Sequence, residues 1–229
     1  MTGLFFTGTD TDVGKTFVVA AVARELRRRG ETFRVCKPVA TGSVPAEDTR
    51  ILAEAAGDSD LEAITPWAFP EPAAPPVAAR LAGVTLSLPE IAAGARRRGD
   101  GGALLLVEGV GGLLCPLTER ETVADLAAEL RLPLVVVARR SLGTLNHTLL
   151  TLEVARGRGL TVAGVVVSET APPRGAAEET NVEELRKRIG VPLLAVVPHG
   201  VAEAAELRRV DWRGLAGAGD GDGGAGCNR

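Results

Sequence analysis

Residues 8–16, Gly-Thr-Asp-Thr-Asp-Val-Gly-Lys-Thr, constrain the fold of this chain more than any other segment. They follow the apolar run 4–6 and precede a helical pattern that begins near Phe17. A strand, a glycine-bounded turn and a Gly-Lys-Thr helix start form a phosphate-binding loop, because backbone N–H groups there cradle phosphate oxygens. Lys15 adds a mobile positive charge, and the Thr16 hydroxyl can reach a Mg²⁺ ion. The segment therefore predicts an α/β protein that binds a nucleoside triphosphate.

The spacing within this loop departs by one residue from the usual pattern. That pattern places four residues between its first glycine and the Gly-Lys pair. Here five residues separate Gly8 from Gly14, and Thr9 stands where the first glycine is expected. The strand before the loop and the helix after it are the context that a functional phosphate loop requires.

The length and composition fit one α/β domain. The chain has 229 residues, of which 45% are hydrophobic but only 3% aromatic, so the core must consist mainly of Leu, Val and Ala. We expect this single domain to span residues 1–213. Residues 214–229 are mostly Gly, Ala and Asp, and we expect a disordered tail there, because such a segment is too polar and flexible to pack.

Apolar runs alternate along the chain with helical patterns. Several runs are unbroken, among them 104–107 and 134–137, as is typical of parallel strands covered by helices on both faces. We predict strands at 4–7, 33–38, 103–108, 134–138, 162–168 and 193–198. We predict helices at 15–29, 47–56, 88–98, 122–130, 145–158 and 176–188. This alternation indicates a doubly wound, mostly parallel sheet in a three-layer sandwich like that of P-loop NTPases.

The proline-rich stretch 65–76 interrupts this alternation. Proline fixes its backbone φ angle and lacks an N–H donor, so we expect an irregular loop over one face instead of a helix or strand.

Charge, hydropathy and cysteine usage exclude several classes of partner. The net charge of −3 gives no electrostatic reason to expect a nucleic acid. We expect no membrane contact, because no segment approaches 18 uninterrupted apolar residues, and the start of the chain lacks a signal-peptide pattern. The three cysteines, Cys36, Cys115 and Cys227, lack metal-ligand spacing. Reduced thiols in a cytoplasmic protein account for them.

Polar residues at the carboxyl ends of strands are the best guide to a site, since ligands of open α/β sheets bind there. Lys37 ends the second predicted strand, and it is either a surface lysine or the partner of an anion such as a transferred phosphoryl group. Glu108 ends the third, where it is either a turn carboxylate or a Mg²⁺ ligand. Asp48 opens the 47–56 helix and is a weaker candidate, since acids are common at helix N-termini.

A further strand end leads into the segment 139–147. Gly143 and Thr144 precede a long predicted helix whose free N–H groups can bind a carboxylate. His147 lies on its first turn, where it is either a surface or capping histidine or a catalytic one.

Four of these segments together resemble the dethiobiotin synthetase family. The motifs are Gly-Thr-Asp-Thr-Asp-Val-Gly-Lys-Thr at 8–16, Cys-Lys-Pro-Val at 36–39, Val-Glu-Gly-Val-Gly-Gly at 107–112 and Leu-Gly-Thr-Leu-Asn-His-Thr at 142–148. They match in order and spacing over about residues 1–200, and the five-residue loop spacing is itself a family feature.

The resemblance implies a cytoplasmic ligase of biotin biosynthesis that converts ATP, CO₂ and 7,8-diaminopelargonic acid to dethiobiotin, ADP and phosphate. One amine becomes a carbamate, whose oxygen attacks the γ-phosphate to give a carbamic–phosphoric anhydride. The second amine then closes the cyclic urea and expels phosphate. Family enzymes are homodimers that bind the substrate across the subunit interface.

The resemblance also implies residue roles. Lys15, Lys37 and Thr11 would act at the reacting groups, and Thr16, Asp48 and Glu108 would hold Mg²⁺. The nucleotide would contact Asp12, Val13, Gly14, Lys15, Thr16, Phe17, Asp48, Glu108, Gly109, Val110, Gly111, Ser168, Glu169, Pro198, His199 and Gly200. The diamine would contact Thr11, Lys37, Thr41 and Gly111, and its carboxylate would reach Gly143, Thr144, Leu145 and Asn146 of the second subunit.

Three positions depart from the family pattern. Thr41 stands where some members have Ser, and Ser168-Glu169 stands where many carry Asn-Asp to read the adenine edge. A serine hydroxyl offers fewer contacts than an asparagine amide, so we predict a relaxed nucleotide preference. The chain has no Tyr, although some members place one at the substrate carboxylate; the equivalent region is near Thr180 and Asn181.

The same residues disfavour three other nucleotide-binding functions. A cobyrinic-acid amidase would need a glutaminase domain, for which the chain has no room. A switch ATPase of the partition or cell-division type would carry an additional lysine early in the loop, where this chain has Thr9, Asp10 and Thr11. An inactive nucleotide-binding module is disfavoured because Lys15, Thr16, Lys37 and Glu108 are all present.

Overall fold

A six-stranded parallel sheet forms the centre of the molecule in the computed structural model, which describes residues 1–201 and 204–217. Its strand order is β2-β5-β1-β6-β7-β8, and every neighbouring pair is parallel. The strands are β1 (Gly3–Gly8), β2 (Phe33–Cys36), β5 (Leu104–Gly112), β6 (Leu134–Arg139), β7 (Val162–Ser168) and β8 (Leu193–Val197). All six lie where the apolar runs predict strands, and the doubly wound, parallel architecture is confirmed.

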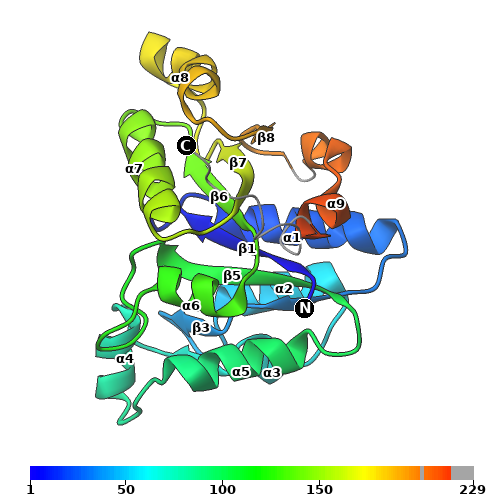
Figure 1. The fold of residues 1–229 in the computed structure, drawn as a ribbon, viewed down its shortest axis with the longest axis vertical. Helices are drawn as coiled ribbons and strands as arrows, with labels where there is room; N and C mark the ends of the chain where they lie inside the picture. The colour runs from blue at the N-terminus through cyan, green and yellow to red at the C-terminus, as the bar shows by residue number, and fades with distance from the viewer. Residues whose placement is uncertain (202–203, 218–229) are drawn as a thin grey trace, which may run out of the picture.

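Alternate residues of each strand pack against helices on opposite faces of the sheet. Leu4 and Phe6 of β1 contribute to one core with α1, α2 and α9, whereas Phe5 contributes to another with α5 and α6. A third cluster joins β6 and β7 to α7 and α8. Figure 1 shows α1 and α9 on one side of the sheet, with α6 and α7 on the other. Because both faces are covered, the strands are apolar throughout, as parallel strands require.

The six predicted helices are present, with ends within one residue of the prediction. They are α1 (Lys15–Arg28), α2 (Glu47–Ala56), α5 (Leu88–Arg98), α6 (Val123–Leu130), α7 (Thr144–Gly157) and α8 (Gly175–Arg188). The start of α6 is fixed by a capping box, in which Thr122 and Asp125 satisfy each other's backbone N–H groups. The strand–helix alternation brings the carboxyl ends of all six strands to one edge of the sheet.

The prediction of an irregular loop over 65–76 is wrong. Strand β4 (Trp67–Phe69) pairs in parallel with β3 (Val39–Thr41), and helix α4 (Pro75–Leu81) starts inside the same stretch. The prolines are compatible with both elements, since a two-stranded sheet leaves one edge of β4 unpaired and Pro75 occupies the first turn of α4, where no N–H donor is needed. The small sheet holds Lys37 and Pro38 beside the site, because Trp67 donates its N–H to the Pro38 carbonyl.

Besides β3, β4 and α4, three further short elements have no counterpart in the sequence prediction: α3 (Leu61–Ile64), the 3₁₀ helix η1 (Ala205–Arg209) and α9 (Trp212–Gly217). Trp212 is fully buried against Phe6, so α9 covers part of the core on the α1 face. The predicted tail at 214–229 thus starts inside a helix, with Ala216 buried; its remainder, 218–229, lies outside the described residues.

Two further observations concern membrane spans and cysteines. None of the described helices is long and apolar enough to cross a membrane. Cys36 and Cys115 are free thiols, while Cys227 falls outside the part of the chain that the structure describes.

Candidate nucleotide and catalytic site

The phosphate loop leaves the end of β1 and closes on itself before α1. Thr9 donates its N–H to the Val137 carbonyl, which joins the start of the loop to β6. The Lys15 ammonium folds back and donates to the Asp10 carbonyl at 3.1 Å. Gly14, the residue before α1, has a φ of 88°, a left-handed conformation that glycine adopts without strain. The first N–H groups of α1 are therefore available to an anion, as in phosphate-binding loops.

Gly14 also packs directly against the end of β7. A Cβ atom at this position would lie 2.5 Å from the Ser168 hydroxyl oxygen, so no larger residue fits without a shift. Thr170, two residues further along the chain, lines the same cavity as the loop. The end of β7 thus forms one wall of the phosphate site.

Four polar side chains meet beside the loop. Lys37 donates to Glu108 Oε1 at 2.8 Å and forms an ion pair with Asp48, and Thr16 donates its hydroxyl to the same Glu108 oxygen at 2.8 Å. Lys37 and Glu108 are buried, whereas Asp48 is partly exposed. The cluster combines residues that are distant in sequence, because β2 and β5 are neighbours in the sheet.

The charges of this cluster depend on one another. Burial by itself would lower the pKa of Lys37, but the Glu108 and Asp48 carboxylates outweigh it and raise the pKa, so this lysine stays positively charged. Burial also opposes ionisation of Asp48, but Lys37 lowers the pKa of that carboxyl overall. For Lys15, burial dominates over the attraction of Glu108 and lowers the pKa. An anion beside Lys15 would offset its loss of hydration.

The loop and the cluster share a cavity of about 380 Å³, the size range of a small-molecule site. Its lining residues are Thr11, Asp12, Gly14, Lys15, Thr16, Phe17, Lys37, Thr41, Asp48, Glu108, Val110, Gly111 and Thr170. All of these except Thr170 are among the residues that the sequence suggests for the site. Thr170 was missed because it follows β7 without any motif of its own.

The other predicted residues lie outside the lining of this cavity. Val13 is fully buried, and Gly109 packs against Phe5 and Val123. At the ends of β7 and β8, the Glu169 carboxylate is turned to Arg140 and to the backbone N–H of His199 instead of facing the cavity. The remaining residues form two groups, at the end of β8 and at the start of α7: Pro198, Gly200, Gly143, Thr144, Leu145 and Asn146.

An adjoining, more apolar cavity of about 370 Å³ shares Thr11 and Gly111 with the first. Its other lining residues are Thr9, Asp10, Gly112, Leu113, Leu114, Cys115, Leu150, Thr151 and Val154. A ligand reacting beside Thr11 thus has an apolar surface next to it, built from the end of β5 and one side of α7.

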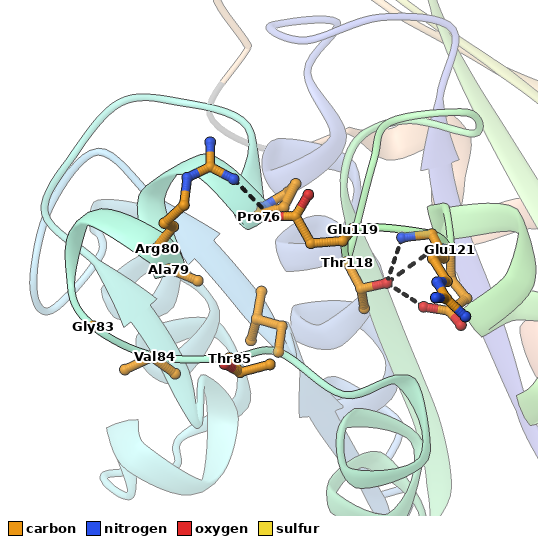
Figure 2. Close-up of a pocket in the computed structure, with 11 residues that line it drawn as sticks. Pro76, Ala79, Arg80, Gly83, Val84, Thr85, Thr118, Glu119 and Glu121 are labelled. Atoms are coloured by element: carbon orange, nitrogen blue, oxygen red, sulfur yellow. Dashed lines mark hydrogen bonds and ion pairs between the residues drawn. The ribbon is translucent and has the colours of Figure 1, made fainter.

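A larger cavity, of about 460 Å³, lies elsewhere, between α4, the segment that follows α4, and the turn at 118–121 (Figure 2). Arg80 pairs with Glu119 at 2.6 Å across it, and the Thr118 hydroxyl accepts the N–H groups of Arg120 and Glu121. This larger cavity is lined by none of the predicted site residues. Its polar side chains bond to other residues that line the same cavity. The chemistry of the chain therefore favours the smaller cavity at the phosphate loop.

The described residues contain no group of three or more His, Cys, Asp or Glu side chains arranged to hold a metal. Mg²⁺ does not need such a group, since it is usually bound by one or two carboxylates together with phosphate oxygens and water. Glu108 Oε2 is buried and has no hydrogen-bond partner among the described residues. A buried carboxylate oxygen in this state can accept a cation, and the pair Glu108 and Asp48 with the Thr16 hydroxyl fits Mg²⁺ in its donor chemistry.

Glu108 lies within β5 and not at its end as predicted, because the strand continues to Gly112. The parallel sheet, the loop before α1 and this buried carboxylate define a P-loop nucleotide-binding protein. The chain resembles solved structures of this class: a ParA family ATPase from Chlorobium tepidum has a TM-score of 0.53 at 13% identity over 87% of this chain and 85% of that one. The Aquifex aeolicus MinC:MinD cell division complex gives a TM-score of 0.53 at 12% identity over 91% and 86%. At these identities the likeness shows the fold alone.

Sequence comparisons define the family more narrowly. A family model described as an AAA domain matches residues 2–202. An ATP-dependent dethiobiotin synthetase from Anaeromyxobacter dehalogenans is 47% identical over 86% of this chain and 90% of the relative. Its counterpart in Bacillus licheniformis is 40% identical over 86% of each chain. The chain belongs to the ATP-dependent dethiobiotin synthetase family.

Proposed function

We propose that this protein carboxylates 7,8-diaminopelargonic acid with CO₂ and closes the product to dethiobiotin at the expense of ATP. One amine adds to CO₂ and loses a proton, and the carbamate oxygen then takes the γ-phosphoryl group, releasing ADP. The second amine attacks the carbonyl carbon of the resulting anhydride, and the C–O bond to phosphate breaks as the cyclic urea forms. The observation that carries this proposal is the ion-pair cluster of buried Lys37 and Glu108 with partly exposed Asp48, which shares one cavity with Lys15 and Thr16 of the phosphate loop.

Each group in this cavity suits one part of that reaction. The N–H groups at the start of α1 and the Lys15 ammonium would bind the phosphates, while Lys37 would face the carbamate and the phosphoryl group in transfer. Thr16, Asp48 and Glu108 would hold Mg²⁺, which would neutralise charge on the β- and γ-phosphate oxygens. Thr11, Thr41 and the Gly111 backbone would orient the two amines. Such a site accelerates phosphoryl transfer mainly by positioning and by electrostatic stabilisation.

The apolar cavity beside Thr11 supports a proposal for the substrate chain and for the subunit arrangement. A long-chain diamino acid has methylene groups that an apolar surface can cover, and this cavity offers Leu113, Leu150 and Val154. Leu114 and Leu150 are largely exposed in a single chain, as is Leu142 before α7. A homodimer that covers these leucines would bring Gly143–Asn146 of the second subunit to the substrate carboxylate, where the start of α7 offers free N–H groups.

The nucleobase would lie over the ends of β7 and β8. The phosphates would occupy the loop before α1, where the Lys37 cluster lies on the β2–β5 side and Gly14 packs against Ser168 on the other side. The serine offers one small hydroxyl, so we infer a relaxed nucleotide preference. Turnover of ATP, GTP and CTP at equal concentrations tests it: rates within about tenfold of one another are expected, and a preference for ATP of about a hundredfold, near 2.7 kcal/mol, would refute it.

Product formation is the direct test of the reaction. The protein is mixed with diaminopelargonic acid, bicarbonate, Mg²⁺ and ATP, and dethiobiotin is sought by mass spectrometry. ATP hydrolysis that the diamine does not change, with no dethiobiotin formed, would favour a switch ATPase of the partition or cell-division type instead. The sequence Thr9-Asp10-Thr11, which lacks the early lysine of those proteins, favours the synthetase. The cytoplasm, where Cys36 and Cys115 would stay reduced, is the proposed location.

A further inference from the structure

A partly buried ion pair outside the catalytic cavity joins the ends of three strands. Arg140 follows β6, Glu169 follows β7, and the two form a charge-assisted contact in which the side chains are only 18% and 11% exposed. The second oxygen of Glu169 accepts the backbone N–H of His199, which lies just beyond β8, at 3.2 Å. The pair therefore links β6, through β7, to the turn after β8.

The geometry of Arg140 is fixed from every side of its guanidinium. Nε donates to the Glu178 carbonyl at 2.8 Å, Nη2 donates to the Glu179 carbonyl at 2.9 Å, and Nη1 contacts Glu169. The two carbonyls belong to α8, so the same side chain also ties that helix to the strand ends. A planar fork with all three nitrogens engaged has one orientation, which a lysine cannot reproduce.

Backbone contacts continue the same connection. The Arg140 N–H donates to the Ser168 carbonyl at 3.0 Å, and the Glu169 N–H donates to the Val197 carbonyl at 2.9 Å. Ser168 is the residue against which Gly14 of the phosphate loop packs. The Arg140–Glu169 pair thus sets the position of the turn 198–200 relative to Ser168 and, through it, relative to the phosphate loop.

We propose that Arg140 is a positioning residue for the nucleobase: with Glu169 it holds the turn 198–200 at a fixed distance from Ser168, and so shapes the pocket that receives the base. The inference rests on the proposed nucleotide site. A buried ion pair adds little net stability, because the loss of hydration offsets the attraction. This pair instead fixes the geometry at the junction of three strand ends, next to the wall of the phosphate site that the end of β7 forms.

The experiment compares ADP with inorganic tripolyphosphate, both with Mg²⁺, by isothermal titration calorimetry. Tripolyphosphate reaches the phosphate loop but has no base. In Arg140→Met, the Kd of ADP should rise about tenfold while the Kd of tripolyphosphate changes less than about twofold. Arg140→Lys, which keeps the charge but loses the fork, should lie between wild type and Arg140→Met. In turnover, the KM for ATP should rise with kcat nearly unchanged.

Two further variants separate positioning from folding. Arg140→Met leaves Glu169 buried without its cation, so the double variant Arg140→Met/Glu169→Leu, which buries no charge, carries the test if the single variant does not fold. Arg188→Met removes an exposed arginine of α8 that pairs with Glu184, and it should change neither Kd.

Equal weakening of ADP and tripolyphosphate would overturn the inference, because it would indicate a general structural role. Unchanged binding of both ligands in Arg140→Met and in the double variant would overturn it as well. A wild-type protein that binds neither ligand would refute the proposed nucleotide site, and the inference with it. If the wild-type protein binds both ligands and the variants lose affinity for ADP and tripolyphosphate equally, only the positioning role of Arg140 is refuted.

Discussion

At the scale of single residues, Lys37 is the side chain on which the proposed chemistry depends most. It is buried between Glu108 and Asp48 and remains a cation because both carboxylates raise its pKa. In Lys37→Met we expect kcat to fall about a hundredfold or more, since stabilisation of a developing anion is lost. The Kd of ADP should change by less than about threefold, because Lys15 and the loop N–H groups bind the phosphates.

The control for this variant is Lys187→Met, which removes an exposed lysine of α8 that pairs with Glu184. Steady-state kinetics and calorimetric titration with ADP separate the two roles. A large loss of ADP binding with a normal kcat would assign Lys37 to nucleotide binding instead of the reacting centre.

Gly14 provides a second prediction at this scale. Gly14→Ala should raise the Kd of ADP by about tenfold or more, because an added methyl group meets the Ser168 hydroxyl at 2.5 Å and its φ of 88° strains any other residue. Gly30→Ala is the matched control: its φ is also positive, at 71°, but an added Cβ would meet no heavy atom within 4 Å among the described residues other than its chain neighbours.

Both glycine variants should lose about 1 kcal/mol of stability from the backbone strain, measured by thermal unfolding. Only Gly14→Ala should weaken ADP binding. If Gly30→Ala weakens ADP binding to the same extent, backbone strain at the two ends of α1 and not the contact with Ser168 determines affinity.

The sequence predicts the proposed reacting residues better than those proposed to position the base. Lys37 and Glu108 end apolar runs, and strands that form one sheet must bring their carboxyl ends to the same edge, so their meeting was predictable. The contact between Arg140 and Glu169 spans 29 residues and depends on how α8 packs. No motif or periodicity marks such a contact, and neither Arg140 nor Thr170 was among the predicted residues.

At the scale of elements, helices α1 and α8 carry ion pairs of the same spacing that differ in burial, and we expect them to differ in their contribution to stability. Glu25 is almost fully buried and contacts Arg28 and Arg29, one turn further along. Glu184 of α8 has the same spacing to Lys187 and Arg188, but at the surface. The hydrogen bond from Arg28, opposed by burial and aided by Arg29, lowers the pKa of Glu25 to about 2.

This shift predicts a pH-dependent contribution of Glu25 to stability. A carboxyl whose pKa is lower in the folded state stabilises the fold above its ordinary value of 4.5, and the contribution disappears as the pH falls towards 2. Glu25→Gln should therefore lower the free energy of unfolding by about 1 kcal/mol at pH 7 and by little at pH 2, measured by urea titration.

Glu184→Gln is the matched control and should have a much smaller effect at either pH, because water screens its two partners. Equal losses in both variants at pH 7 would show that helix spacing, and not burial, determines the contribution. A loss in Glu25→Gln that is the same at pH 2 and pH 7 would contradict the shifted pKa.

The elements that the sequence failed to predict share a physical cause. Strand β4 has only three residues and lies between prolines, and its partner β3 is equally short. Periodicity needs longer segments to be recognised, and the pairing of β3 with β4 is a tertiary contact. The part of α9 from residue 214 onward was predicted to belong to a disordered tail because of its glycines, but Trp212 and Ala216 pack against the core and hold the helix.

At the scale of the whole molecule, the proposed site is incomplete in one subunit. The start of α7, which would bind the substrate carboxylate, lies outside the lining of the catalytic cavity of its own chain. Leu142, two residues before α7, is 78% exposed, and Leu114 and Leu150, which line the apolar cavity, are exposed as well. A second copy of the chain that covers these residues would complete the site.

Leu142→Asp should therefore dissociate the proposed homodimer, because burying a carboxylate in an apolar interface costs several kcal/mol. Sedimentation velocity would show a monomer at micromolar concentration, and the KM for the diamine should rise while the Kd of ADP stays unchanged. Leu81→Asp is the control, since Leu81 is 68% exposed on α4, away from the site, and should leave the dimer intact. If Leu81→Asp dissociates the protein and Leu142→Asp does not, the interface lies at α4, and the carboxylate must be bound by residues of one subunit.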